Sequence, residues 1–174
     1  MMLTKQAIET YFVAEKQTAL LLLLIGVLTL ITGIAGWLYC KNQFSKGIAI
    51  PCIVVACIQI SVGAALASRS YENRVQIVYS LDMNPSYLQQ NELPRMQKVL
   101  NNFTLYKYVE LATCIAGIAF MAYGYFVPAQ KWYLGIGVAL AVQAVILLSV
   151  DFFAQKRAET YTQLLQQFVN QLHQ

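Results

Sequence analysis

The chain has 174 residues, of which 58% are hydrophobic and only 11% are charged, whereas soluble domains carry about 25% charged residues. This composition excludes an ordinary soluble domain, because too little polar surface would remain to face water. The formal net charge of +4 is small, so it does not indicate a nucleic-acid-binding protein.

Four apolar stretches follow one another at residues 18–39, 47–67, 107–127 and 132–153. Each is close to the ~20 residues with which a helix crosses the hydrocarbon core of a membrane. Because that core leaves open backbone groups unsatisfied, we expect helices and not strands. Glu9 and Glu15 precede the first stretch and no A-x-A-like site follows it, so we expect a retained span and not a cleaved signal peptide.

Four spans would place both termini and the 68–106 segment on one side of the membrane. That side would carry nine of the twelve Lys and Arg residues, and the other side would carry Lys41, Lys46 and Lys131. An excess of Lys and Arg is typical of cytoplasmic segments. We therefore predict an integral protein of a bacterial inner (cytoplasmic) membrane with both termini in the cytoplasm.

Two of the apolar stretches resemble each other. "GIAIPCIVVACIQISV" (47–62) and "GIGVALAVQAVILLSV" (135–150) share seven of 16 residues at an offset of 88 positions. The same offset also pairs Gly36 with Gly124, without a gap. Such self-similarity is typical of an internal duplication; the alternative is a chance resemblance between two apolar helices.

The predicted fold is therefore all-α, with four transmembrane helices arranged as two helical-hairpin repeats. Repeat unit one would comprise residues 1–86 and repeat unit two residues 87–174. Because each unit has two spans, both would insert in the same orientation, as parallel repeats related by an axis along the membrane normal.

The segments outside the spans also have helical patterns. In the 68–108 segment, the Asn84-Pro85 pair is typical of a helix stop and restart, and we expect the same at Pro94. Alternatively, residues 87–91 stay irregular. The predicted helices would extend two of the spans into the cytoplasm.

The C-terminal segment has an apolar stripe that includes Tyr161, Leu165, Phe168 and Leu172, with glutamines on the other face. This pattern is typical of an amphipathic helix, and the N-terminal segment has a similar one. Each could pack into a cytoplasmic helical bundle, lie on the membrane surface or bind a partner. We favour the bundle and take the C-terminal stripe as a candidate partner surface.

Polar residues inside the spans are sparse, and the candidates are Thr29, Thr32, Gln59, Glu110 and Gln143. At the offset of 88, the two glutamines lie on equivalent helix faces, one turn apart. We interpret them as interhelical hydrogen-bonding residues; the alternative is a pore or binding site.

Glu110 and Asp151 lie near the cytoplasmic ends of the third and fourth spans. An interfacial charge, with Glu110 paired to Lys107, is the favoured interpretation. A proton or ion relay is the alternative.

No pattern of catalytic, cofactor-binding or metal-ligating residues is present. The only histidine is His173, and the four cysteines form no C-x-x-C pair. We therefore predict a non-enzymatic, membrane-anchored interaction or structural subunit that presents a cytoplasmic helical surface to a protein partner or to itself. The alternative function is a small homo-oligomeric channel or transporter. Membrane lipid and a protein partner or homo-oligomer are the expected partners, and no cofactor or nucleic acid is expected.

Overall fold

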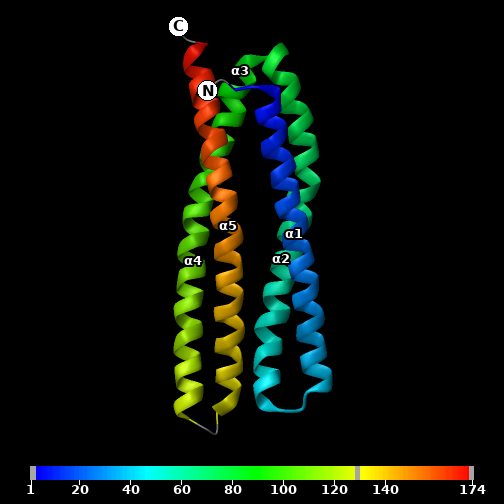
Figure 1. The fold of residues 1–174 in the computed structure, drawn as a ribbon, viewed down its shortest axis with the longest axis vertical. Helices are drawn as coiled ribbons and strands as arrows, with labels where there is room; N and C mark the ends of the chain where they lie inside the picture. Colours follow the sequence, from blue (N-terminus) through cyan, green and yellow to red (C-terminus); the bar gives the residue numbers. More distant parts are fainter. Residues whose placement is uncertain (1–2, 128–129, 173–174) are drawn as a thin grey trace.

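The computed structural model describes residues 3–127 and 130–172, which are almost wholly helical (Figure 1). The helical elements are α1 (Lys5–Tyr39), α2 (Gln43–Met83), α3 (Pro85–Tyr87), a π-helical turn η1 (Leu88–Glu92), α4 (Leu93–Phe126) and α5 (Lys131–Gln171). Four helical segments are long and apolar enough to cross a membrane: α1, α2, the α3–η1–α4 segment and α5. The prediction of four long apolar helices is thereby confirmed.

The helices form two antiparallel hairpins that stand side by side. Helix α1 packs against α2, α4 packs against α5, and the two hairpins meet mainly through α2 and α5. Helix α1 begins and α5 ends at the same end of the bundle (Figure 1). Helices of 34 to 41 residues exceed the ~20 residues of one membrane crossing, so each hairpin is longer than such a crossing requires.

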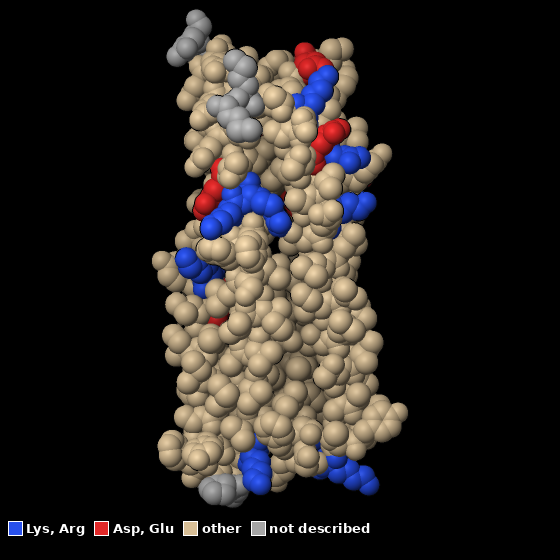
Figure 2. Space-filling model, in the orientation of Figure 1, with Lys and Arg blue, Asp and Glu red and all other residues tan. Residues whose placement is uncertain are grey.

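Charged side chains are segregated along the long axis of the bundle. In Figure 2 they gather at the end where α1 begins and α5 ends, a few Lys and Arg residues lie at the opposite end, and the belt between is almost free of charge. We call the charged end, beyond the predicted spans, the extramembrane end, and the part that contains the predicted spans the membrane half.

The turn between the hairpins departs from the pattern predicted at Pro94. A helix does begin at Pro85, directly after Asn84, as the sequence predicts. However, the helix doesn't restart at Pro94, because the chain passes from η1 into α4 without a break. The Leu93 N–H donates to the Leu88 carbonyl, and this i to i+5 bond carries the helix through as a π turn.

The two hairpins approach most closely where two glycines face backbone. A Cβ atom at Gly47 would collide with the carbonyl of Trp132, and one at Gly135 would collide with the carbonyl of Phe44. Positions 44 and 132, like 47 and 135, are 88 residues apart. Shifting the residues of one contact by 88 positions, forward for one residue and back for the other, therefore gives the residues of the other contact.

Contacts inside the hairpins follow the same offset in part. Gly33 packs against Ala49 in the first hairpin, and Gly137 packs against Met121 at the equivalent position of the second. A difference occurs near the tips of the hairpins: a Cβ at Gly36 would have ordinary van der Waals contact, whereas one at Gly124 would collide with the backbone of α5.

The main apolar core lies at the extramembrane end. Its buried members are Leu3, Ile8, Tyr11, Phe12, Ile77, Leu88, Met96, Ala158, Tyr161 and Leu165. Both ends of the chain contribute to this core, together with α2, η1 and α4. The amphipathic stripes at the two ends of the chain thus pack against each other in a helical bundle.

Candidate functional site

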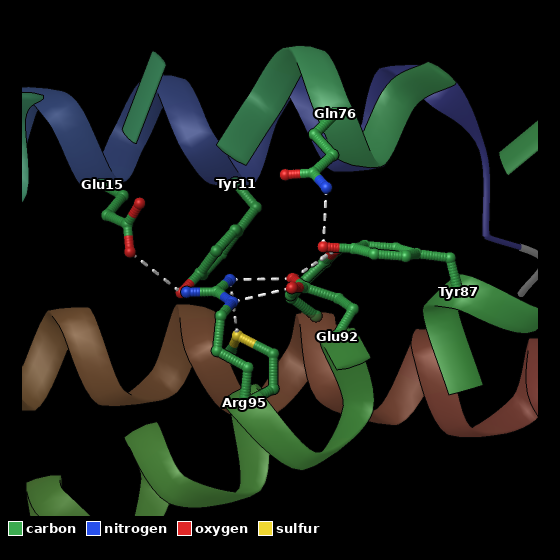
Figure 3. A network of polar contacts seen from close by, with 8 residues as sticks. Tyr11, Glu15, Gln76, Tyr87, Glu92 and Arg95 are labelled. Atoms are coloured by element: carbon green, nitrogen blue, oxygen red, sulfur yellow. Dashed lines mark hydrogen bonds and ion pairs between the residues drawn. The ribbon is translucent and has the colours of Figure 1, made fainter. Parts of the chain in front are cut away.

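A buried ion pair lies at the centre of the extramembrane core (Figure 3). Glu92 is the last residue of η1, and its side chain is only 2% exposed. Arg95, one turn later in α4, donates from Nε to Glu92 Oε2 over 2.7 Å and from Nη2 to Oε1 over 2.8 Å. Tyr161 of α5 donates to the same Oε1 over 3.1 Å. Both carboxylate oxygens are therefore satisfied, which is what a buried charge requires.

The guanidinium of Arg95 is enclosed by neighbours other than Glu92. It also donates to Met96 Sδ over 3.3 Å and lies 5.6 Å from the centre of the Phe12 ring. Burial alone would lower the pKa of Arg95, but the hydrogen bonds and charge of Glu92 outweigh it and raise the pKa. Arg95 is therefore held in its charged form.

Two stacked tyrosines join the ion pair to the N-terminal helix. The rings of Tyr11 and Tyr161 lie 4.3 Å apart and almost parallel. Burial is the main cause of a raised pKa at both, so both phenols stay neutral and donate hydrogen bonds. Tyr11 donates to Glu15 over 3.5 Å, and burial also raises the pKa of Glu15. The network connects α1, η1, α4 and α5, and it is suited to holding helices together.

In the membrane half, the structure brings together three of the five predicted polar residues. Gln59 of α2 donates from Nε2 to Gln143 Oε1 over 2.9 Å, and Gln143 of α5 donates from Nε2 to Thr29 Oγ1 of α1 over 3.1 Å. Gln59 is 1% exposed, and the other two are also buried. This chain of two amides and one hydroxyl, which we call the amide chain, links three helices and both hairpins.

The other two predicted residues lie apart from this chain. Thr32 is exposed and donates to the Leu28 carbonyl of its own helix. Glu110 is buried and lines a groove between α4 and α5 together with Asp151. Its Oε2 atom has no hydrogen-bond partner among the described residues, and the expected ion pair with Lys107 is not formed in that part of the chain.

Most of the C-terminal stripe faces inward. Tyr161 and Leu165 are buried in the extramembrane core, and Phe168 packs against it. Only Leu172 is exposed, at 46%. Three of the four residues considered as a partner surface are thus occupied within the chain.

A different surface, on α2, is left uncovered. It comprises exposed residues that lie within an arc of about 80° at 3.6 residues per turn, and we call it the α2 seam: Cys57, Ser61, Ala64, Ser68, Tyr71, Val75 and Tyr79. Its last three members lie outside the predicted span and are 57%, 52% and 63% exposed. The spacing of the seam can be read from the sequence, but its lack of a covering helix can't.

Within the described ranges, no group of three or more His, Cys, Asp or Glu side chains could hold a metal ion. No protein-family model, curated protein or solved structure matches the chain.

Proposed function

We propose that the chain is an integral membrane protein whose four long helices each cross a bacterial inner membrane once, with both termini in the cytoplasm. The belt of the bundle that is almost free of charge, between two charged ends (Figure 2), supports insertion. We further propose that residues 1–86 and 87–174 are duplicated hairpin repeats. The two glycine contacts between the hairpins involve positions that are equivalent at an offset of 88, which supports the duplication.

The proposed function is non-enzymatic: a membrane-anchored interaction subunit that associates with a second copy of itself through the α2 seam. The observation that carries this proposal is the exposed line of Tyr71, Val75 and Tyr79. Val75 and Tyr79 lie two or more helical turns beyond the predicted span, where water and not lipid would surround them. Single exposed apolar residues are ordinary on protein surfaces, whereas a continuous line of them is typical of an interaction site.

The extent of the seam indicates what kind of partner covers it. Inside the predicted span the seam consists of small residues, which allow close approach of another membrane helix. The partner helix must therefore run through the bilayer and continue along Tyr71–Tyr79. Helix α2 of a second copy has this length and orientation, and a two-fold axis along the membrane normal would pair the two seams.

The charges beside the seam favour self-association. None of the seven seam residues is charged, and Asp82, the next exposed residue on the same arc, is paired with Lys5 within the chain, so pairing two copies opposes no unpaired like charges. Glu72 and Arg74 lie on opposite flanks of the seam, with the Arg74 guanidinium 5.4 Å from the centre of the Tyr71 ring. In a parallel pair, the acidic flank of one copy would face the basic flank of the other, as at the flanking positions of a coiled coil.

The alternative, a channel or transporter lined by the glutamines, has less support. Gln59 and Gln143 donate hydrogen bonds within the bundle, to Gln143 and Thr29 respectively. A water-filled pathway would need polar side chains along one stripe over the whole span.

Cysteine cross-linking in native membranes tests the pairing of seams. On a Cys-free background, Val75→Cys should form a disulfide-linked dimer on mild oxidation, whereas Gln97→Cys, also exposed at the extramembrane end but on α4, should not. With Cys57 as the only cysteine, the same dimer should form inside the membrane. Equal cross-linking at residues 75 and 97, or cross-links only to other proteins, would reject self-association through the seam.

The orientation has a separate test. On the Cys-free background, a membrane-impermeant thiol reagent added outside intact cells should label Lys131→Cys and leave Gln90→Cys unlabelled. The reverse pattern would place the termini outside the cytoplasm.

A further inference from the structure

A groove of about 560 Å³ lies between α1 and α5 at the extramembrane end. Its walls include the side chains of Lys156, Arg157, Gln6, Thr10 and Thr160, and its lining contains no carboxylate. In Figure 2, blue side chains gather on the face between these two helices. The groove therefore has two positive charges and no carboxylate in its lining, and acidic side chains lie beside the blue group in Figure 2.

The two cations of the groove have few partners inside the chain. Among the described residues, neither Lys156 nor Arg157 forms an ion pair. Lys156 Nζ lies 4.4 Å from the centre of the Phe152 ring, and Arg157 Nη2 donates to Thr18 Oγ1. Because a guanidinium has five N–H donors in a planar fork, most of the donor capacity of Arg157 is left for an external anion.

The position of the groove relative to the predicted spans indicates the source of such an anion. The fourth predicted span ends at residue 153, so Lys156 and Arg157 follow within about one helical turn. On α1, Ala14 lines the same groove one turn before the first span begins at residue 18. The end of the groove that contains Ala14, Lys156 and Arg157 is therefore at the level of lipid headgroups, and the opposite end lies further from the bilayer.

We propose that this groove binds the phosphate group of an anionic lipid, with Lys156 and Arg157 as its ligands. Basic pockets between transmembrane helices are suited to anionic headgroups, and the fork of an arginine matches phosphate geometry. The proposal rests on membrane insertion, but it is independent of the α2 seam, which lies on another helix.

The sequence repeat supplies a matched control. Arg69 is the counterpart of Arg157 at the offset of 88 and follows the second predicted span within one helical turn. It is exposed, its Nε donates to the Ala65 carbonyl, and it does not line the groove. Arg69→Gln removes one positive charge near the same level without changing the groove.

The test compares thermal unfolding of the full chain in nanodiscs of phosphatidylglycerol and of phosphatidylcholine. We expect the wild-type Tm to be higher in phosphatidylglycerol by about 2–4 °C, since a ligand that binds only the folded state stabilises it. The Lys156→Gln/Arg157→Gln variant should lose most of this difference, and Arg69→Gln should keep it. Because each variant is compared with itself in two lipids, an overall loss of stability does not obscure the result.

A second arm separates lipid from free phosphate. Inorganic phosphate is added to the detergent-solubilised chain, with chloride at equal ionic strength as reference. Stabilisation by phosphate that the double variant lacks would support the phosphate site and assign its ligand to solution. No difference between the two lipids together with no effect of phosphate would overturn the proposal, and so would an equal loss in Arg69→Gln. Resistance of the chain to alkaline extraction from membranes shows separately whether insertion itself holds.

Discussion

The membrane half and the extramembrane end bury polar groups in different ways. Near the middle of the spans, three helices are joined by the uncharged side chains of Gln59, Gln143 and Thr29. At the extramembrane end, the helices are joined by the Glu92–Arg95 ion pair and by the hydrogen bond that Tyr161 donates to Glu92. The difference follows from desolvation, because transferring a charge out of water costs far more than transferring an amide.

The two regions also differ in how closely their backbones pack. In the membrane half, glycines allow α2 and α5 to touch backbone to backbone, as is typical where lipid supplies no hydrophobic force between helices. At the extramembrane end, large side chains such as Phe12 and Leu165 fill the core, because water there makes apolar burial favourable. Four predictions, from the largest expected effect to the smallest, test this comparison.

Removing one partner of the ion pair should have the largest effect. Arg95→Met leaves the Glu92 carboxylate buried without its main partner, which should lower the free energy of unfolding by about 3 kcal/mol. This is the lower end of the usual range, because the Arg95 side chain is 31% exposed. Glu92→Gln/Arg95→Met should recover much of the loss. Chemical denaturation in mixed micelles measures both, and an equal loss in the double variant would show that packing, not charge, is responsible.

A methyl group at the crossing of the two hairpins should have the next largest effect. Gly47→Ala places a Cβ against the Trp132 carbonyl, and backbone can't move aside as a side chain can, so we expect a loss of about 2 kcal/mol. Gly36→Ala is the control, because its Cβ would lie 3.8 Å from the nearest atom and alanine favours the helix. Similar Tm values for the two variants would show that close approach of the hairpins contributes little.

The amide chain should contribute less than the ion pair. Gln59→Leu removes one hydrogen bond between the hairpins and should cost about 1 kcal/mol or less. Gln143→Leu should cost more, since it removes both bonds of the chain. Thermal unfolding measures these losses, and flux through reconstituted vesicles should be unchanged in both variants. A wild-type conductance abolished by Gln59→Leu at unchanged stability would instead support the channel alternative.

The smallest effect should come from Glu15 and should depend on pH. Burial raises its pKa above the ordinary value of 4.5, so the folded state binds the proton more tightly than the unfolded state. The stabilisation from this proton is complete below pH 4.5 and is lost as the pH rises through the raised pKa. Glu15→Gln lacks this loss, so its Tm relative to wild type should increase across that window and then level off. A constant difference at all pH values would show that Glu15 does not titrate in this range.

The sequence alone was sufficient to predict the four long helices. Each apolar stretch is long enough to span a bilayer, and the structure places all four in helices. The apolar stripe at each end of the chain could also be predicted from the sequence, because water distinguishes the two faces of an amphipathic helix. The π turn at Leu88–Glu92 was not, because the rule that places a helix start at proline considers only neighbouring residues.

Only the tertiary structure decided which side chains meet. In a predicted membrane span, lipid-facing and helix-facing surfaces are equally apolar, so hydrophobicity does not indicate that Gln59 meets Gln143 or that Thr32 faces outward. At the extramembrane end, Tyr161 joins Glu92 from a position 69 residues away. The α2 seam is a surface that no other described helix covers, so identifying it required the position of every other helix. Periodicity specifies the face of a helix, whereas the partner of that face is determined by packing of the whole chain.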